Sequence, residues 1–302
     1  MTTCLRRVKF LPQQFTNMIK PLTQRSNGHG LLRIHWLFIG LLAVGFLYLL
    51  ARSWRTPDLP PAAVSIQTLP VGCPANLSGT AGRHNDEQTV SGLTFTVVAP
   101  LNYQADHRYG LLMVFPPAGF SKEMAEHYYQ LTSAGNTQGY VVVYSSAIPL
   151  SKRALKLQSE VVPQVMSRWC IDPARVVFAG HSDGGSLATG LTVRPDNGSV
   201  LPGRVVISAA GITEEDLRLE KCPAPLNVTV LHNPKDDLFP GYGTGTTRWW
   251  GDCMQCSADV AIENSGCELR QCSQGKVLRH CVTVEPHIRW PKVTSHLWEW
   301  LD

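Results

Sequence analysis

The sequence is poor in charged residues, which make up 17% of its 302 positions, whereas hydrophobic residues make up 44%. Disordered chains have the opposite balance, because many charges and few apolar side chains leave too little surface to bury. From about residue 64 onward the sequence also contains no internal repeat and no low-complexity stretch. These absences exclude an extended or repetitive protein and predict a globular chain with a sizeable core.

Acidic residues are absent from positions 1–56, although eight lysine and arginine residues occur there. The rest of the chain holds 19 of the 27 basic residues and all 23 acidic ones, so its net charge is −4, against +4 for the whole sequence. The part expected to fold is therefore mildly acidic. The basic balance of the whole chain is no evidence for nucleic-acid binding, and we expect no nucleic-acid partner.

An uninterrupted apolar segment spans residues 34–51, and His35 is its only ionisable side chain. As a helix it would be about 27 Å long, close to the thickness of the hydrocarbon core of a bilayer. Six basic residues precede the segment and two follow it closely, a distribution that places its N-terminal side in the cytoplasm. We predict a basic cytoplasmic segment at 1–33, a transmembrane signal-anchor helix at 34–51, a Pro-rich linker at 52–72 and an exported domain at 73–302.

Two other interpretations of residues 34–51 remain open. A cleaved signal peptide is one, although the run is long and Leu49-Leu50-Ala51-Arg52 is a poor cleavage site. A buried core helix is the other, although the segment is apolar on every face. A signal anchor and a cleaved signal peptide both direct export, so under either of them the domain lies on the periplasmic or extracellular side.

Cysteine usage agrees with export. Eight of the nine cysteines follow the apolar segment: Cys73, Cys170, Cys222, Cys253, Cys256, Cys267, Cys272 and Cys281. An even number in an oxidising compartment predicts disulfides, but eight cysteines allow 105 connectivities, so no pairing follows. Five of them crowd the end of the chain, which predicts a Cys-rich insertion at about 241–281. The alternative is a zinc site, because the Cys253-x2-Cys256 spacing resembles that of zinc ligands.

Apolar strand-like runs alternate with helical patterns in the outer part of the chain. Several runs are continuous, such as Leu111–Phe115 and Val141–Tyr144, which is typical of strands buried on both faces of a parallel sheet. The alternation predicts an α/β fold with a mostly parallel central sheet flanked by helices. The expected strands are 93–99, 110–115, 139–144, 175–179, 204–208, 226–231 and 277–284, and the expected helices are 122–138, 152–169 (interrupted by Pro163), 184–193 and 293–301.

The stretch Gly180-His181-Ser182-Asp183-Gly184 follows one of these strands and precedes a helix. A G-x-S-x-G motif in that setting is typical of a serine nucleophile held in a sharp turn. Glycines are needed there because a Cβ would clash with the neighbouring strand and helix. The helix N-terminus favours developing negative charge, and the N–H of Asp183 is a candidate oxyanion donor. An ordinary glycine-rich turn is the alternative. We assign no acid or base role to the side chains of His181 and Asp183.

A serine nucleophile needs a base and an orienting carboxylate. In enzymes with a G-x-S-x-G turn of this kind, these residues follow along the chain in the order serine, acid, histidine. Asp236 and Asp237 both come just after the apolar run 226–231, and spacing does not choose between them. His287 lies between the last strand and the last helix, which makes it the best candidate base. His280 and His296 are weaker candidates because they lie inside a strand and a helix, and His232 is better suited to holding the acid loop.

With these residues assembled, the region from about Cys73 to the C-terminus resembles the polyhydroxybutyrate depolymerase and feruloyl-esterase-like family of α/β-hydrolases. The resemblance is carried by the 90–103 region, the elbow at 180–185, His232-x3-Asp236-x3-Pro240 and Pro286-His287-x2-Trp290-Pro291. It implies an α/β-hydrolase fold and selects Asp236 over Asp237 as the acid. It also implies a catalytic trio of Ser182, Asp236 and His287.

Two departures from that family concern the site. The family usually has His-Gly where this chain has Pro116-Pro117, and proline has no N–H. The resemblance places the second oxyanion donor on the next residue, Ala118, which keeps its N–H. The chain also has one extra residue between His287 and Trp290, which we expect to alter the approach of the histidine.

These features predict a serine esterase that needs no metal or cofactor and acts on small-molecule or oligomeric esters. The same residues would serve an acyltransferase acting on cell-envelope substrates. A catalytically inactive binding protein on the same fold is a further alternative, motivated by the two prolines. Trp249 and Trp250 are candidates for stacking on an aromatic acyl group or for simple packing.

Overall fold

The computed structural model describes residues 73–301 except residues 75 and 197. The predicted signal-anchor helix, the basic segment before it and the linker after it all lie outside the described residues. Among the helices that are described, none has the length and hydropathy of a membrane-spanning helix. The anchor therefore stays a prediction, and the structure bears on the exported domain.

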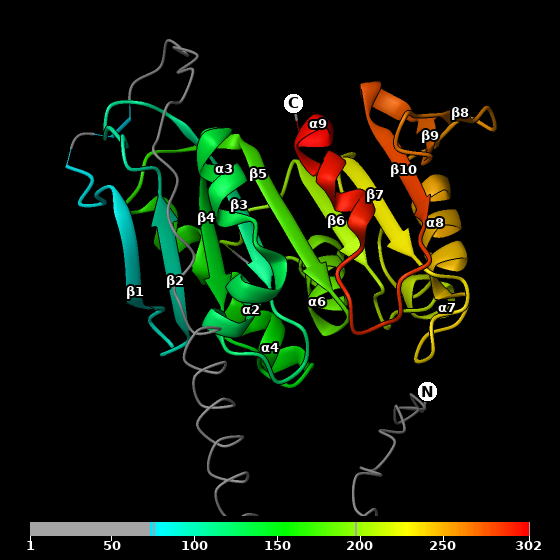
Figure 1. Cartoon of the computed structure of the whole chain (residues 1–302), viewed down its shortest axis with the longest axis horizontal. Coiled ribbons are helices and arrows are strands. Elements are labelled where there is room, and N and C mark those ends of the chain that lie inside the picture. The colour runs from blue at the N-terminus through cyan, green and yellow to red at the C-terminus, as the bar shows by residue number, and fades with distance from the viewer. Residues whose placement is uncertain (1–72, 75, 197, 302) are drawn as a thin grey trace, which may run out of the picture. The chain divides into compact units, whose positions relative to one another are not determined.

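Ten strands of the described chain form one mixed sheet (Figure 1). Its order is β1-β2-β4-β3-β5-β6-β7-β10-β9-β8, with parallel pairing from β4 through to β10 and antiparallel pairing at both edges. The strands are β1 (Gly82–Gln88), β2 (Thr94–Ala99), β3 (Tyr109–Phe115), β4 (Tyr140–Ser145), β5 (Ile171–His181), β6 (Arg204–Ser208), β7 (Asn227–His232), β8 (Ala261–Ile262), β9 (Glu268–Gln271) and β10 (Val277–Val282).

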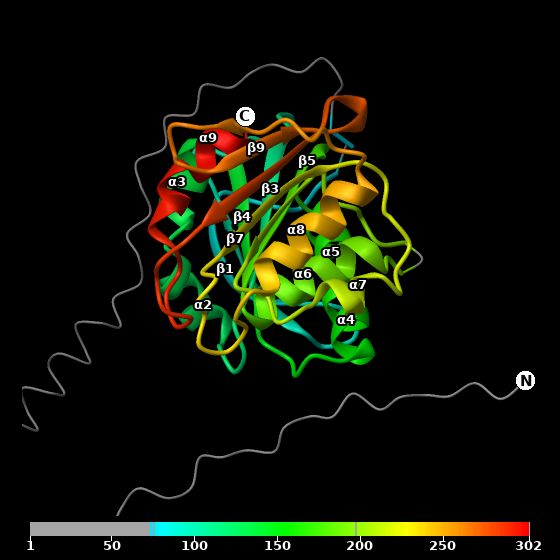
Figure 2. The same ribbon diagram turned by 90° about the vertical axis from the view of Figure 1, so that its right-hand side faces the viewer.

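Helices cover both faces of the sheet, as Figure 2 shows. On one face lie α4 (Lys152–Ser159), α5 (Val161–Met166), α6 (Asp183–Val193), α7 (Glu214–Leu217) and α8 (Tyr242–Cys253). On the other lie α2 (Lys122–Tyr129), α3 (Thr132–Thr137) and α9 (Leu297–Leu301), the last preceded by the 3-10 turn η2 (Lys292–His296). Every residue of β3 and of β4 is buried, as expected of strands covered on both sides.

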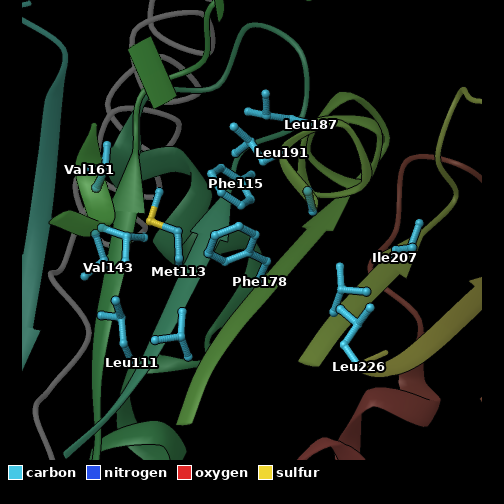
Figure 3. Close-up of a cluster of buried hydrophobic side chains, with 14 of the residues drawn as sticks. Leu111, Met113, Phe115, Val143, Val161, Phe178, Leu187, Leu191, Ile207 and Leu226 are labelled. Carbon is cyan, nitrogen blue, oxygen red and sulfur yellow. The ribbon is translucent and has the colours of Figure 1, made fainter. Parts of the chain in front are cut away.

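The larger core fills the space between the sheet and the α6 face. Figure 3 shows Phe115 and Phe178 of neighbouring strands directed toward Leu187 and Leu191 of α6. The two phenylalanine rings meet edge to face with their centroids 5.3 Å apart. Both lie within a few residues of strand ends that lead into the site, so this packing fixes those ends against the helix.

Two predicted helices are each divided in two. The helix expected at 122–138 breaks at Gln130, which has a left-handed φ of 52° and ends α2. The helix expected at 152–169 breaks at Glu160, between α4 and α5, and Pro163 lies in the first turn of α5. Proline is tolerated there, because the first turn of a helix needs no N–H donors. The break therefore comes three residues before the proline that was expected to cause it.

The eight outer cysteines form four disulfides: Cys73–Cys170, Cys222–Cys253, Cys256–Cys272 and Cys267–Cys281. The prediction of disulfides is confirmed. Cys253 and Cys256, which have zinc-like spacing, are bonded to Cys222 and Cys272 and so are not free to ligate a metal. Disulfides of this number are typical of an oxidising extracellular or periplasmic environment.

The segment at about 241–281, expected to be a Cys-rich insertion, consists largely of regular helix and strand. It opens with α8, which connects β7 to its parallel neighbour β10, and it ends in β10 itself. Only the stretch between these two elements, with β8, β9 and the turn η1 (Ser273–Gly275), adds a short antiparallel extension to the sheet edge. Because the cysteines were interpreted as a sign of irregular, loop-rich structure, the βαβ unit of β7, α8 and β10 was not predicted.

Candidate active site

Ser182 lies in a sharp turn between the end of β5 and the start of α6. Its backbone has φ 57° and ψ −123°, a conformation that costs a non-glycine residue about 1–3 kcal/mol. Its N–H donates to the carbonyl of Ser208 at the end of β6, at 2.9 Å. A Cβ on Gly180 would lie 2.2 Å from the carbonyl oxygen of Gly184. The strand-turn-helix predicted for this motif is present, and its outer glycines are required by close backbone approach.

The acid and base candidates follow two strands that lie side by side. Asp236 comes after β7 and His287 after β10, and these strands pair in parallel with His232 opposite Val282. Parallel strands end at the same edge of the sheet, which is where ligands bind in open α/β sheets. The pairing of β7 with β10 therefore brings together two side chains that are 51 residues apart.

Three side chains form one hydrogen-bonded chain at this edge. Nε2 of His287 lies 2.8 Å from Oγ of Ser182, and Nδ1 of His287 lies 2.8 Å from Oδ2 of Asp236. With Nδ1–H donating to the carboxylate, Nε2 is left to accept the serine proton. Asp236 and His287 are buried, 3% and 6% exposed, so little water competes for these hydrogen bonds.

Asp236 is held as an acceptor by more than the histidine. Its Oδ1 accepts from the N–H groups of Leu238, at 2.9 Å, and Phe239, at 2.8 Å. Burial raises the pKa of Asp236, but the hydrogen bonds from Phe239, His287 and Leu238 outweigh burial and keep this pKa below its usual value. Asp237 is exposed, and its Oδ1 accepts from the main-chain N–H of His287 at 3.4 Å instead of from the ring. The geometry thus separates two carboxylates that spacing alone did not.

The other histidines have separate partners. His232 donates from Nε2 to the carbonyl of Phe239, at 2.8 Å, and so holds the acid loop as expected. His280 faces Glu268 at 3.8 Å, and His296 faces Glu299 at 3.1 Å. Within the described residues, neither of these two makes a hydrogen bond with Ser182 or Asp236.

The candidate oxyanion loop keeps a free N–H despite its prolines. Pro116 and Pro117 are buried, and Phe120 closes a turn by donating to the carbonyl of Pro117 at 3.2 Å. Ala118 is exposed within that turn, and in the described part of the chain no hydrogen bond uses its N–H. The N–H of Asp183 is at the first position of α6, where a helix provides no acceptor. Both amides are thus available as donors.

The extra residue in the base loop is accommodated by a turn. The N–H of Arg289 donates to the carbonyl of Pro286 at 3.0 Å. The ring of Trp290 then packs edge to face on Tyr129 of α2, with centroids 4.8 Å apart. His287 retains its contact with Ser182, so the longer loop does not move the imidazole out of reach.

Sequence reasoning missed the part that His181 plays in this arrangement. Its ring is 2% exposed and contacts both Ser208 and the main chain of His287. The signal that the sequence offers is the position of His181 directly after a continuous apolar run, where a side chain is expected to be buried. Asp183, the other variable position of the motif, is half-buried, and burial raises the pKa of its carboxyl.

The two tryptophans proposed for stacking lie in the core on α8. Trp250 is 0% exposed and Trp249 is 6% exposed, and both belong to the cluster that packs on the sheet. Of the two readings left open for them, packing is the one that the structure supports. In the described residues, no group of three or more His, Cys, Asp or Glu side chains is placed to hold a metal ion.

Several solved structures with a similar fold are described as esterases. An acetyl xylan esterase from Aspergillus awamori matches with a TM-score of 0.55 at 13% identity, covering 74% of this chain and 99% of that one. An esterase from Thermogutta terrifontis with butyrate bound matches with a TM-score of 0.51 at 12% identity, covering 73% and 90%. A truncated carbohydrate esterase from gut microbiota matches with a TM-score of 0.51 at 10% identity, covering 76% and 98%.

No protein-family model matches the chain, and no curated protein sequence does. At identities of 10–13% the structural likeness concerns the fold. The chain therefore has a mixed α/β fold, with a central sheet flanked by helices, and this fold is similar to that of the solved esterases.

Proposed function

We propose that this protein is a serine hydrolase that cleaves carboxylic esters. The observation that carries the proposal is the hydrogen-bonded chain from Ser182 through His287 to Asp236, with both links at 2.8 Å. An ordinary glycine-rich turn would not account for a strained serine within hydrogen-bond distance of a buried imidazole–carboxylate pair. The esterase activity of the structural neighbours and the resemblance to depolymerases and feruloyl esterases favour esters as the substrate class.

In the proposed reaction, Ser182 attacks the ester carbonyl while its proton passes to Nε2 of His287. Asp236 holds the imidazole in the tautomer that accepts this proton and stabilises the imidazolium that forms. The N–H groups of Asp183 and Ala118 stabilise the oxyanion. The imidazolium then protonates the departing alkoxide, which leaves as an alcohol. Water then attacks the acyl-enzyme carbonyl as His287 takes its proton. When the bond to Ser182 breaks, His287 returns this proton to Oγ of Ser182, so the products are one acid and one alcohol.

We further propose small or oligomeric esters as substrates and a domain held at the membrane by the predicted helix at 34–51. A tethered domain reaches small diffusing esters more readily than the interior of an insoluble polymer. The disulfides support placement of the domain outside the cytoplasm.

The decisive experiment compares wild type with Ser182→Ala. Wild-type protein should react with a fluorophosphonate probe and release p-nitrophenol from short-chain p-nitrophenyl esters. The variant should lose probe labelling and at least about 10³-fold in kcat/KM, with an unchanged circular dichroism spectrum. Folded wild type that neither labels nor turns over any of these esters would instead support the inactive binding protein. Product analysis with added alcohol separates hydrolysis, which yields the free acid, from acyl transfer, which yields a new ester.

A further inference from the structure

His181 contacts the residue that carries the proposed base. Its Nε2 lies 2.5 Å from the main-chain oxygen of His287, and its Nδ1 lies 2.9 Å from Oγ of Ser208. Since a carbonyl only accepts, Nε2 of His181 carries the proton, and Nδ1 accepts from the hydroxyl of Ser208. Both ring nitrogens are therefore paired, and the partners dictate a single neutral tautomer.

The surroundings of the ring keep it neutral and immobile. The centroids of Tyr128, Trp290 and His287 lie 5.7, 6.1 and 5.3 Å from that of His181. Burial lowers the pKa of His181 to about 4, so its protonated form is scarce at neutral pH. Its ring is too well enclosed to change orientation without displacing the base loop.

The backbone of His181 belongs to the same network. Its N–H donates to the hydroxyl of Tyr129 at 2.8 Å, and that hydroxyl donates to the carbonyl of Phe115 at 2.9 Å. Phe115 is the last residue of β3, directly before the loop that contains Ala118. His181 thus connects the nucleophile turn with the base loop through its side chain, and with the oxyanion loop through its backbone.

Two consecutive residues therefore hold one histidine at two points. His181 binds the main chain of His287, and Ser182 binds its ring at 2.8 Å. We infer that His181 is a positioning residue that fixes the main chain of His287 so that Nε2 stays within reach of Ser182. This inference rests on the proposed function, because it assigns His181 a part in bringing base and nucleophile together.

Variants of His181 distinguish a role in positioning His287 from a role in fold stability alone. Gln places a side-chain N–H near the position of Nε2 and keeps the hydrogen bond to His287. Asn reaches only the position of Nδ1, so it keeps the contact with Ser208 and loses the one with His287. Phe fills the volume and loses both. A positioning role therefore predicts the order wild type, then Gln, then Asn and Phe.

The test measures kcat and KM for p-nitrophenyl butyrate, together with the rate of fluorophosphonate labelling. His181→Phe and His181→Asn should lower kcat and the labelling rate by about 10–100-fold, with KM within about threefold, because small displacements of reacting groups are costly. His181→Gln should recover to within about fivefold of wild type. Val165→Ala, a buried change in α5, is the control: it should lower the melting temperature but leave kcat at 25 °C unchanged.

Two outcomes overturn the inference. One is a folded His181→Phe variant with wild-type kcat and labelling rate. The other is equal loss in the Gln, Asn and Phe variants, in proportion to their loss of stability. Failure of the proposed function looks different, because wild-type protein itself would then show neither labelling nor turnover.

Discussion

Gly184 lies directly against the carbonyl oxygen of Phe115: a Cβ on this glycine would come within 2.2 Å of that oxygen and 2.9 Å of the carbonyl oxygen of Pro116. The first turn of α6, which presents Asp183 N–H, is thus packed on the backbone that leads into Ala118. This one contact between two backbone segments determines the distance between the two proposed oxyanion donors. Any side chain at residue 184 has to separate them.

Gly184→Ala is therefore expected to lower kcat by about 10²–10³-fold, the range seen when an oxyanion donor is lost. Gly190→Ala in the same helix is the matched control. Its new Cβ meets mainly the flexible end of Leu155, at 2.8 Å, and alanine favours helix over glycine. The control should keep wild-type kcat within about twofold and an equal or higher melting temperature. Wild-type kcat in Gly184→Ala would show that this contact does not hold the donors.

The two neighbouring aspartates should respond very differently to loss of charge. Asp236→Asn removes the carboxylate that orients His287 and should lower kcat by about 10⁴-fold, as in serine proteases. Asp237→Asn changes an exposed group and should stay within about threefold of wild type. Steady-state kinetics on both variants measures this difference. Comparable losses in the two would mean that the acid has been assigned to the wrong residue.

Stability should fall in mild acid because of His181. Burial lowers its pKa from 6.5 to about 4, so between these values the unfolded chain binds the proton more readily than the folded one. The contribution of His181 is complete above about pH 6.5 and is lost as the pH falls toward 4. It amounts to roughly 2–3 kcal/mol of the free energy of unfolding between pH 7.5 and pH 4.5.

Guanidinium unfolding at several pH values tests this expectation in wild type and His181→Gln. The variant cannot titrate at this position, so its stability should depend less steeply on pH. Burial also lowers the pKa of His232 and His280, and these groups add a slope of the same sign to both proteins. Equal slopes in wild type and variant would rule out His181 as a source of the pH dependence.

The disulfides are expected to differ in their contribution to stability. Cys73–Cys170 closes a loop of 97 residues and Cys256–Cys272 one of 16. In the chain-entropy account, losing the first costs about 4–5 kcal/mol and losing the second about 3 kcal/mol. Double alanine variants, unfolded by denaturant at pH 7, compare the two. A larger loss from the short loop would show that local packing, rather than unfolded-chain entropy, decides the contribution of these bridges.

The sequence carried enough information to predict the sheet and the three candidate site residues. Continuous apolar runs mark strands that are buried on both faces, and residues after such strands gather at one edge. Ser182 and His287 were identifiable because each stands in such a position, whereas Asp236 was chosen over its neighbour Asp237 only through the family resemblance. The pairing of β7 with β10 brings the loops that contain Asp236 and His287 to the same edge of the sheet.

Other features depend on register and contacts that no local pattern encodes. The contact of His181 with the main chain of His287 spans 106 residues and needs the ring to leave β5 on the side of the base loop. The pairing of Cys267 with Cys281 follows from the pairing of β9 with β10, which no local pattern of the sequence shows. β1 is polar and lies at the sheet edge, so it lacks the apolar run that marks a strand.

Under the proposed function, the placement of His287 after β10 would keep the chain inactive until that part of it has been synthesised. A nascent chain folded only as far as the loop after β7 would contain Ser182 and Asp236 but not His287, the proposed base, so it would be inert toward esters. Activity would arrive with the loop that follows β10, the strand that carries Cys281, the partner of Cys267. Under the proposed function, ester cleavage would therefore report completion of the oxidised domain, and an assay during refolding would register the docking of β10.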